Sequence, residues 1–361
     1  MTDKQLILTI NPGSTSTKIA IFDGNQSPME EVFEQILRHS SEDLAEFDTI
    51  IDQYDFRLNI IMETLTESGY KPEDLAIVVG RGGLVRPVES GSYLVNDRMI
   101  SDLRDPNRGA HASNLGAFLA KGIADEAGLV AMIVDPVVVD ELTDVARLSG
   151  LKDIERTATF HALNQKAVAR RYCKAMDKKA EDINLIVVHL GGGISIGSHE
   201  KGRIIEVPNA LYGEGPFSPE RSGALPAEPL VRLCFSGKYT EEELLKMIHG
   251  QGGMVSYLGT NSGIEVADRI KAGDKEAELV FHAMAYQVAK EVGAAAAVLR
   301  GQVDAIIITG GMAYNADFVS WITDRIDWIA PIEVYPGEDE LLALAEAGQR
   351  VLLGEEEAKD Y

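Results

Sequence analysis

Short apolar runs, each ended by a turn of small residues, are the most regular pattern along this chain. The first two runs, residues 6–10 and 19–22, flank Asn11-Pro12-Gly13, a group of strong turn formers. This arrangement predicts a strand, a turn and a second strand that returns along the first.

Small hydroxyl residues and a lysine begin the second strand of this predicted hairpin. Because successive side chains of a strand face opposite sides, we expect Ser14, Ser16 and Lys18 to share one face. Thr15 and Thr17 would share the other face with the apolar residues that follow. Two hydroxyls and an ammonium can donate to anionic oxygens, as the terminal phosphates of a nucleotide require. An ordinary exposed hairpin with a polar side is the competing interpretation.

Helical and strand-like segments alternate after the hairpin. Helical spacing predicts helices over residues 30–39, 48–68, 112–127, 161–176 and 275–300, and a capping box of Thr240 and Glu243 opens another. Apolar runs predict strands over residues 75–79, 93–95, 129–134, 183–190, 203–207 and 305–309. This alternation indicates an α/β fold, in which ligands bind at the carboxyl ends of strands. Asp135 directly follows one of these strands and is placed accordingly.

Glycine-rich turns recur after the apolar runs. The turn at residues 11–13 is followed by Gly191-Gly192-Gly193 and by Gly310-Gly311. Glycine lets the backbone approach a ligand closely and leaves N–H groups free to surround a phosphate. An apolar strand, a glycine turn and a serine-bearing strand occur in both halves, as a weak internal repeat. Such turns in both halves suggest a bound nucleotide, although the sequence has neither a Walker-type GxxxxGK[ST] loop nor a GxGxxG run.

The segment Gly193-Ile-Ser195-Ile-Gly197 matches the GxSxG motif of serine hydrolases. That motif needs a strand followed by a helix, so that the serine sits on a sharp turn. Here the residues around Ser195 alternate like a strand and are followed by a turn at residues 200–202. We therefore do not expect a serine hydrolase.

Length and charge narrow the functional class. A chain of 361 residues with 45% hydrophobic residues predicts two domains. Its 34 basic and 57 acidic residues give a net charge of −23, which argues against nucleic acid or an anionic membrane as a partner. No apolar run reaches the ~20 residues of a membrane span, and the first residues have too short an apolar core for a signal peptide, so we expect a cytoplasmic protein. Cys173 and Cys234 lack metal-ligand spacing and are expected to be reduced packing residues.

Several motifs in both halves of the chain resemble those of one protein family. They are NPGSTSTK, VVGRGG, VDP, TFHALNQ, VVHLGGGISIG, SPERSGALP and ITGGMAYN, in this order. They resemble the acetokinase family within the acetate and sugar kinase/Hsp70/actin superfamily. The resemblance implies two duplicated ribonuclease H-like domains with an active site in the cleft between them. Residues 1–140 and 341–361 would form the N-terminal domain, and residues 141–340 a C-terminal domain with most of the nucleotide contacts.

The resemblance also implies a reaction. It is the reversible transfer of the γ-phosphoryl group of ATP to a carboxylate, which gives an acyl phosphate and ADP and uses Mg²⁺. The implied substrate is a short-chain fatty acid, butyrate or a branched relative, with acetate or propionate as alternatives, and the implied assembly is a homo-oligomer. A fatty-acid carboxylate is already ionised at neutral pH, because carboxyl pKa values lie near ~4. The reaction therefore needs no strong base and depends on positioning and charge neutralisation.

Residues that match the family motifs take implied roles. The catalytic candidates are Arg81, Asp135, His161 and Arg221. The candidates for nucleotide binding are Asn11, Ser14, Ser16, Lys18, His189, Gly191, Gly192, Gly193, Gly310, Gly311 and Asn315. The candidates for holding the metal are Asn11 and Asp339. By this resemblance, Arg221 would contact the carboxylate and the transferring phosphoryl group, and His161 would stabilise the transition state.

Two stretches depart from the family pattern. Acetate kinases carry an arginine three residues before a His-Gly-Gly run, whereas this chain has Val78 there and continues as Gly80-Arg81-Gly82-Gly83. We infer that Arg81 supplies the charge, with Arg86 as the competitor. Glu338-Asp339-Glu340 replaces an Asn-Glu-Glu run, so the carboxylate that serves the metal stays open.

Other functional classes compete with a carboxylate kinase. An actin- or Hsp70-like ATPase would leave Arg81 and Arg221 unexplained. A sugar kinase would need a carboxylate base for a neutral hydroxyl, for which Asp135 is the obvious candidate. The residues also have plainer interpretations: Lys18 and Arg221 as surface charges, the two histidines as polar core residues, and Asp135 as a turn cap.

Overall fold

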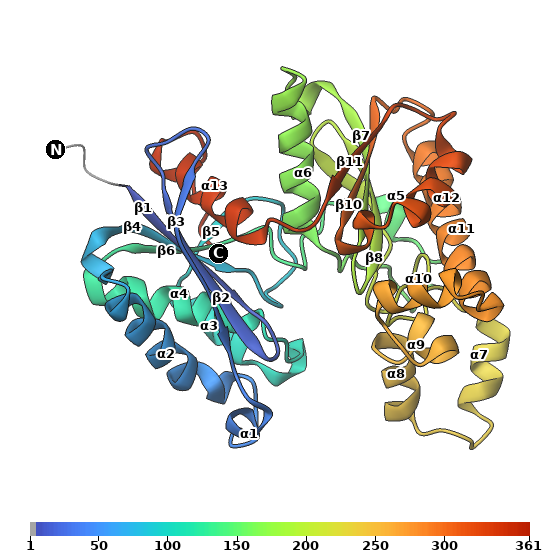
Figure 1. Ribbon diagram of the computed structural model, residues 1–361, viewed down its shortest axis with the longest axis horizontal. Coiled ribbons are helices and arrows are strands. Elements are labelled where there is room, and N and C mark those ends of the chain that lie inside the picture. Colours follow the sequence, from blue (N-terminus) through green and yellow to red (C-terminus); the bar gives the residue numbers. More distant parts are fainter. Residues whose placement is uncertain (1–4) are drawn as a thin grey trace. The chain divides into compact units, whose positions relative to one another are not determined.

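Two compact units make up the chain. The structure is a computed structural model that describes residues 5–361 (Figure 1). One unit contains the residues up to Val139 together with Asp339–Tyr361, and the other is the continuous segment Asp140–Glu338. The cleft implied by the family resemblance stays a prediction. No helix within residues 5–361 has the length and apolar character that crossing a membrane requires.

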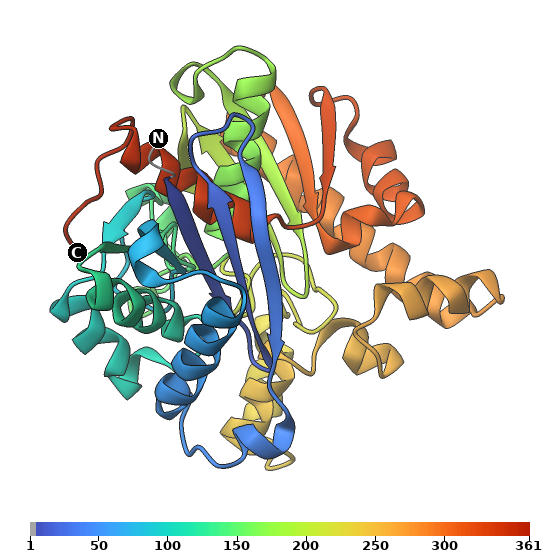
Figure 2. The ribbon, with the colours of Figure 1, turned by 60° about the vertical axis from the view of Figure 1, so that its left-hand side comes forward.

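A six-stranded sheet forms the centre of the first unit. Its strands are β1 (Leu6–Pro12), β2 (Ser16–Asp23), β3 (Glu30–Arg38), β4 (Leu75–Arg81), β5 (Ser92–Leu94) and β6 (Val130–Val134). They lie in the order β3-β2-β1-β4-β6-β5. β1, β2 and β3 form an antiparallel meander, seen in blue in Figure 2, while β4 runs parallel to β1 and β6 parallel to β4. The carboxyl ends of β1, β4 and β6 therefore meet at one edge, where Asn11, Arg81 and Asp135 lie.

Helices of the first unit cover both faces of its sheet. They are α1 (Ser41–Leu44), α2 (Tyr54–Glu67), α3 (Asp97–Arg104), α4 (Asn114–Ala127) and α13 (Glu340–Leu352), with the 3₁₀ turns η1 (Ile51–Gln53), η2 (Pro72–Asp74) and η3 (Pro106–Arg108). α2 and α4 pack on one face, where Leu8 and Ile10 of β1 are fully buried. α13 packs on the other face, where Gly348 lies against Ile7. Residues of β1 are thus buried on both faces of the sheet, which explains why apolar side chains occupy neighbouring positions of this strand.

A five-stranded sheet forms the centre of the second unit. Its strands are β7 (Asn184–Leu190), β8 (Ile194–Glu200), β9 (Arg203–Glu206), β10 (Ala305–Gly310) and β11 (Ile332–Pro336), in the order β11-β10-β7-β8-β9. β7, β8 and β9 form an antiparallel meander, and β10 and β11 run parallel to β7. Both units thus contain a three-stranded meander extended by two parallel strands. This repeated strand order confirms the predicted duplication.

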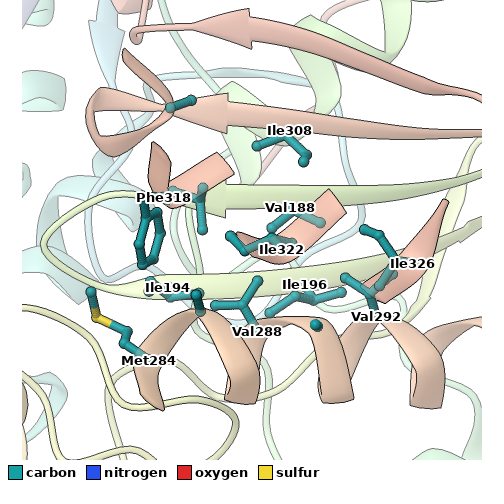
Figure 3. Close-up of a cluster of buried hydrophobic side chains, with 14 of the residues drawn as sticks. Val188, Ile194, Ile196, Met284, Val288, Val292, Ile308, Phe318, Ile322 and Ile326 are labelled. Carbon is teal, nitrogen blue, oxygen red and sulfur yellow. The ribbon is translucent and has the colours of Figure 1, made fainter. Parts of the chain in front are cut away.

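Helices cover both faces of the second sheet as well. They are α5 (Asp144–Arg147), α6 (Ala162–Ala175), α7 (Ala227–Cys234), α8 (Glu241–His249), α9 (Gly253–Leu258), α10 (Gly263–Lys271), α11 (Lys275–Val298) and α12 (Ala316–Ile326), with the 3₁₀ turns η4 (Ala180–Asp182) and η5 (Gly311–Tyr314). Figure 3 shows Val188 and Ile308 of the strands packed with Val288 of α11 and Ile322 of α12. α6 belongs to a separate buried cluster that includes Val187. The sheet is therefore a middle layer between helices.

The predicted helix over residues 30–39 is wrong, because this segment is strand β3. It pairs antiparallel with β2 through an irregular register: Ile21 lies opposite Phe33 and Phe22 opposite Glu31, so Val32 is an extra residue. Val32 and Phe33 both pack partly against the core. A bulge of this kind places two neighbouring apolar residues where strict alternation would place one, and the resulting spacing imitates a helix.

Other predictions from the sequence are confirmed in part. The capping box is confirmed, because the Thr240 side chain accepts from the Glu243 N–H at the start of α8 and the Glu243 carboxylate accepts from the Thr240 N–H. Cys173 is buried as expected, whereas Cys234 is exposed at the end of α7 and is not a packing residue. Ser195 lies inside β8, 1% exposed, and accepts a hydrogen bond from Gln165. The strand expected around Ser195 is therefore confirmed, and Ser195 is not on the exposed strand-to-helix turn of the hydrolase motif.

Candidate active site

Two histidines and a carboxylate meet in the second unit. His189 lies near the end of β7, and His161 is the N-cap residue of α6. The Nε2 atom of His189 lies 3.2 Å from Oε1 of Glu338, and that of His161 lies 3.6 Å from Oε2. The two ring centres are 4.6 Å apart. Glu338 follows β11, so three different elements bring these side chains together.

Asn164, in the first turn of α6, orients both imidazoles. Its backbone N–H donates to Nδ1 of His161 at 3.2 Å, and its Oδ1 lies 2.8 Å from Nδ1 of His189. The Nε2 atoms of both rings are thereby left to face Glu338. Burial raises the pKa of the Glu338 carboxyl, but hydrogen bonds from His161 and His189, together with the charge of His189, outweigh it and hold this pKa well below its usual range. The pair thus forms a site that favours an anion.

This cluster does not fit the metal that the resemblance implies. The possible ligand atoms of His161, His189 and Glu338 lie within 4.8 Å of one another. Mg²⁺, however, prefers oxygen ligands. In addition, Nδ1 of His161 accepts a hydrogen bond, so its neutral ring carries the proton on Nε2 and has no lone pair there for a metal. We therefore regard the cluster as an anion site.

The predicted glycine turn after β7 lies against functional side chains. A side chain at Gly191 would come within 2.8 Å of Nε2 of His189, and one at Gly193 would collide with the Arg221 guanidinium. Ser218 donates to the carbonyl oxygen of Gly192 at 2.6 Å and so fixes the loop that carries Arg221 to this turn. The second unit therefore brings His161, His189, the glycine turn and Arg221 together.

Arg221 has spare donor capacity. Its Nη1 donates to the carbonyl oxygen of Ala210 at 2.9 Å, while its Nε is buried and has no hydrogen-bond partner among residues 5–361. Burial lowers the pKa of Arg221. Nevertheless, an arginine stays charged at neutral pH. A partly buried guanidinium that forms no ion pair with a carboxylate among residues 5–361 is suited to an anionic ligand.

The third predicted glycine turn has a different environment. Gly310 adopts a φ of 94° and lies against the backbone of Leu190, so a side chain would not fit there. Gly311 faces open space. Asn315 caps α12 by accepting from the Phe318 N–H at 2.9 Å. Nucleotide binding by these residues stays a prediction.

In the first unit, Arg81 and Asn11 contact Glu340, one of the three carboxylates among which the sequence left the choice open. Arg81 Nη1 lies 2.7 Å from Oε1 of Glu340 and donates to Oδ1 of Asn11 at 3.3 Å. Asn11 Nδ2 also donates to Glu340. The competitor Arg86 is placed differently, because it pairs with Asp102 and its backbone N–H donates to the Tyr361 hydroxyl.

The predicted hairpin exists, but its strand begins later than expected. Ser14 and Thr15 lie in the turn and are both exposed, so they do not take opposite faces of a strand. From Ser16 onward the expected alternation holds: Thr17 is fully buried, whereas Lys18 is exposed. Lys18 makes no ion pair or hydrogen bond through its side chain within the described part of the chain.

Two predicted acidic residues have contrasting surroundings. Asp135, 2% exposed, adopts a φ of 37° after β6 and accepts from the Ser90 hydroxyl at 2.6 Å and from the Gly91 N–H at 2.8 Å. Asp339 is exposed at the N-cap of α13, and its side chain makes no capping hydrogen bond. The carboxylates on either side of Asp339 are the ones that contact other candidate residues, and the sequence had left the choice among the three open.

The chain is similar to known proteins over almost its whole length. The chain is 57% identical to butyrate kinase 1 of Clostridium acetobutylicum over 355 residues, which cover 98% of this chain and 99% of that protein. It is 54% identical to butyrate kinase 2 of the same organism, with the same coverage. A crystal structure of Porphyromonas gingivalis acetate kinase, 18% identical, superposes with a TM-score of 0.81 and covers 96% of this chain and 100% of that one.

These findings agree with the fold and with the motifs. The structural likeness confirms the predicted fold, which is that of the acetate kinases. The model of the acetokinase family matches residues 131–359, and the relatives match almost the whole chain. The chain therefore belongs to the acetokinase family.

Proposed function

We propose that this protein transfers the γ-phosphoryl group of ATP directly and reversibly to butanoate, giving butanoyl phosphate and ADP. The observation that carries this proposal is the identity of 57% and 54% to two proteins named butyrate kinase, over 98% of the chain. Branched-chain, acetate or propionate specificity is the alternative within the same reaction.

The acceptor needs no general base, because a short fatty acid is ionised at neutral pH. The task is to neutralise negative charge and to align the reacting oxygens. We propose that Arg221 contacts the acceptor carboxylate and the transferring group, with its unpartnered Nε available for this contact. His161 would stabilise the equatorial oxygens of that group, and His189 would contact phosphate. The anion-favouring contact of both rings with Glu338 supports these roles.

We propose that the first unit supplies further cations and donors. Arg81 would be its catalytic arginine, because it contacts Asn11 and Glu340, whereas Arg86 is paired with Asp102. Lys18 is exposed and unpaired within residues 5–361, which suits contact with a terminal phosphate. Asn11, Ser14 and Ser16 would bind beside it.

The Mg²⁺ that such kinases use would bind to oxygen ligands. We propose Asn11 and a carboxylate of the segment 338–340 for this role, with Asp339 the residue predicted from the sequence. Glu340 competes with it, because Glu340 already contacts Asn11. When bound, the ion would neutralise charge on the phosphate oxygens. Asp135 would act near it.

The nucleotide would be held chiefly by the second unit. We propose that the turns at Gly191-Gly192-Gly193 and Gly310-Gly311 bind ATP or ADP, together with Asn315, because glycine lets the backbone approach a ligand. Residues 1–140 with 341–361 and residues 141–340 would be the two ribonuclease H-like domains. A cytoplasmic location and a homo-oligomeric state complete the proposal.

One experiment tests the reaction. Purified protein is incubated with Mg-ATP and carboxylates from acetate to hexanoate, and acyl phosphate is trapped with hydroxylamine. The proposal expects the highest kcat/KM with butanoate. A maximum at acetate or propionate would mean that this acid is the preferred substrate in the same type of reaction. Hydrolysis of ATP without trapped product from any acid would instead favour an actin- or Hsp70-like ATPase.

Arg221→Ala tests the site in the same assay. We expect turnover to fall roughly 100-fold or more, the scale seen when one charge-stabilising donor is removed. The free energy of unfolding should change little, because Arg221 makes one hydrogen bond through its guanidinium among the described residues. An Arg221→Ala protein of full activity would contradict the role assigned to this side chain.

A further inference from the structure

Arg57 is a buried cation that the proposed mechanism does not use. It lies in α2 and is 1% exposed, among the largest fully buried side chains of the described chain. No carboxylate forms an ion pair with it within residues 5–361. Burying an unpaired charge is energetically costly. Because an apolar side chain would avoid this cost, the position calls for an explanation.

The hydrogen-bond partners of Arg57 explain why a charged residue is buried there. Its Nη1 donates to the carbonyl oxygens of Gly13 at 2.8 Å and Ser16 at 3.2 Å, and to the Thr17 hydroxyl at 3.1 Å. Its Nη2 donates to the carbonyl oxygen of Ser14 at 3.0 Å. The guanidinium therefore donates hydrogen bonds to the carbonyl groups of the turn between β1 and β2. The dipoles of these carbonyl groups stabilise its charge in place of a carboxylate.

Gln53 holds the guanidinium in this orientation. Its Oε1 accepts from Nε of Arg57 at 3.1 Å and from Nη2 at 2.8 Å. Gln53 is itself buried. All the N–H groups of Arg57 thus have an acceptor, and the side chain is fixed on one side of the turn.

The opposite side of the turn follows from peptide geometry. In a planar trans peptide, the C=O of one residue and the N–H of the next point in opposite directions. With the Gly13 and Ser14 carbonyls drawn towards Arg57, the N–H groups of Ser14 and Thr15 point away from it. Both residues are exposed, and neither N–H donates to another residue in the described part of the chain. Adjacent N–H groups of this kind form an anion-binding concavity.

We infer that Arg57 is a positioning residue for the terminal phosphates of ATP: it fixes the peptide planes of residues 13–16 so that the Ser14 and Thr15 N–H groups face the ligand. This inference rests on the proposed function. It also explains why the turn needs a full positive charge behind it. The charge polarises the peptide groups, and this strengthens their N–H donors.

The test compares ligands that differ in their terminal phosphates. Arg57→Met keeps an apolar side chain of similar length in the core and removes all the donors, and Arg57→Lys keeps the charge but cannot form the same fork of hydrogen bonds. For each protein, Kd is measured by calorimetry for Mg-ATP and for AMP, and KM for ATP and for the carboxylate. The free energy of unfolding is measured by urea denaturation.

We expect Arg57→Met to raise the Kd and KM of ATP about tenfold or more, the scale of hydrogen bonds to a charged group. The Kd of AMP and the KM of the carboxylate should stay unchanged, and Arg57→Lys should lie between. Ile61→Ala is the matched control, because Ile61 is fully buried one turn further along α2. It should lower the free energy of unfolding without changing the ratio of the two nucleotide affinities.

Two outcomes would overturn the inference. In one, Arg57→Met keeps the ATP affinity of the wild-type protein. In the other, ATP and AMP lose affinity equally, which would mean a merely structural role. If Arg57→Met does not fold, Gln53→Met, which leaves the charge and releases its orientation, must show the same selective loss for ATP on a smaller scale. Failure of the proposed reaction is recognised separately, since nucleotide affinities are measured without acyl transfer.

Discussion

Nε2 of His189 lies 3.2 Å from Oε1 of Glu338, so a carboxylate of the chain itself faces an imidazole that we assign to phosphate. A phosphate group and this carboxylate would repel each other at such a distance. The contact is therefore in competition with the ligand, and the competition can be measured.

Glu338→Gln should tighten the binding of inorganic phosphate about tenfold. Removing a like charge a few ångströms away is worth roughly 1 to 4 kcal/mol in a partly solvated site, and the loss of favourable charge on the imidazoles offsets part of this. Isothermal titration calorimetry with phosphate measures the change. Glu333→Gln is the control, because it removes the same charge from β11, and the ion pairs of the two histidines within residues 5–361 are with Glu338. Weaker binding by Glu338→Gln would show that the carboxylate assists the anion site instead.

Arg81→Ala and Arg86→Ala should lower different quantities: kcat for Arg81→Ala and the free energy of unfolding for Arg86→Ala. Arg81 contacts Asn11 and Glu340, so its loss should lower kcat roughly 100-fold. Arg86 contacts both carboxylate oxygens of Asp102, and Tyr361 also donates to Oδ2 of Asp102, so the loss of Arg86 should lower the free energy of unfolding and leave kcat near normal. The hydroxylamine assay and urea denaturation measure the two quantities. A large loss of kcat confined to Arg86→Ala would reverse the assignment.

Gly193→Ala should act through Arg221. The added methyl group would collide with the guanidinium, which is the movable end of a long side chain. We therefore expect kcat to fall at least tenfold, roughly 1.4 kcal/mol in the barrier, with little change in the free energy of unfolding. Gly293→Ala is the control, because a methyl group there meets nothing within 4 Å and lies inside α11. Normal kcat in Gly193→Ala would mean that Arg221 can work from a displaced position.

His39 should make the stability of the protein depend on pH. Its Nε2 lies 2.9 Å from the Thr17 hydroxyl. Burial, with the Arg57 cation beside it, lowers the pKa of His39 from 6.5 to about 4. The folded protein therefore favours the neutral ring. The resulting stability is fully present above pH 6.5 and is lost as the pH falls towards 4. The reason is that, in this pH range, His39 binds a proton in the unfolded chain but not in the folded chain.

Between pH 7.5 and pH 5 this loss should amount to about 2 kcal/mol in the free energy of unfolding. Urea denaturation at the two pH values gives the quantity for the wild-type protein. In His39→Gln, which does not titrate in this range, the difference should shrink by that amount. Equal differences in the two proteins would mean that His39 does not contribute.

Local patterns were sufficient for much of the fold. Apolar runs and glycine turns predicted the strands that flank residues 11–13 and 191–193, and the capping box at Thr240 predicted a helix start, because these signals depend on neighbours in the sequence. Strand β3 was missed because its bulge is imposed by pairing with β2. Long-range pairing overrides local spacing, and a single sequence does not display it.

The candidate site shows the same difference between local signals, which the sequence displays, and long-range contacts, which it does not. The motifs singled out His161, His189, Arg81 and Arg221 and left the carboxylates of residues 338–340 open, but they did not show which of these side chains contact one another. Glu340 contacts Asn11 across more than 300 positions of sequence, and Arg57 contacts the hairpin across more than 40. Arg57 stands in an ordinary helical pattern, where an arginine is expected to be solvated. Only the packed structure shows that it is buried.

The packing of α13 also bears on the order in which the protein can form. This helix follows the whole of the second unit in the chain, yet it covers one face of the sheet that contains β1 and β4. The segment Asp140–Glu338, by contrast, contains every layer of its own unit. During synthesis the first sheet therefore keeps one apolar face uncovered until the second unit and α13 have been made, and this face is the place where a nascent chain would be most open to a chaperone or to aggregation.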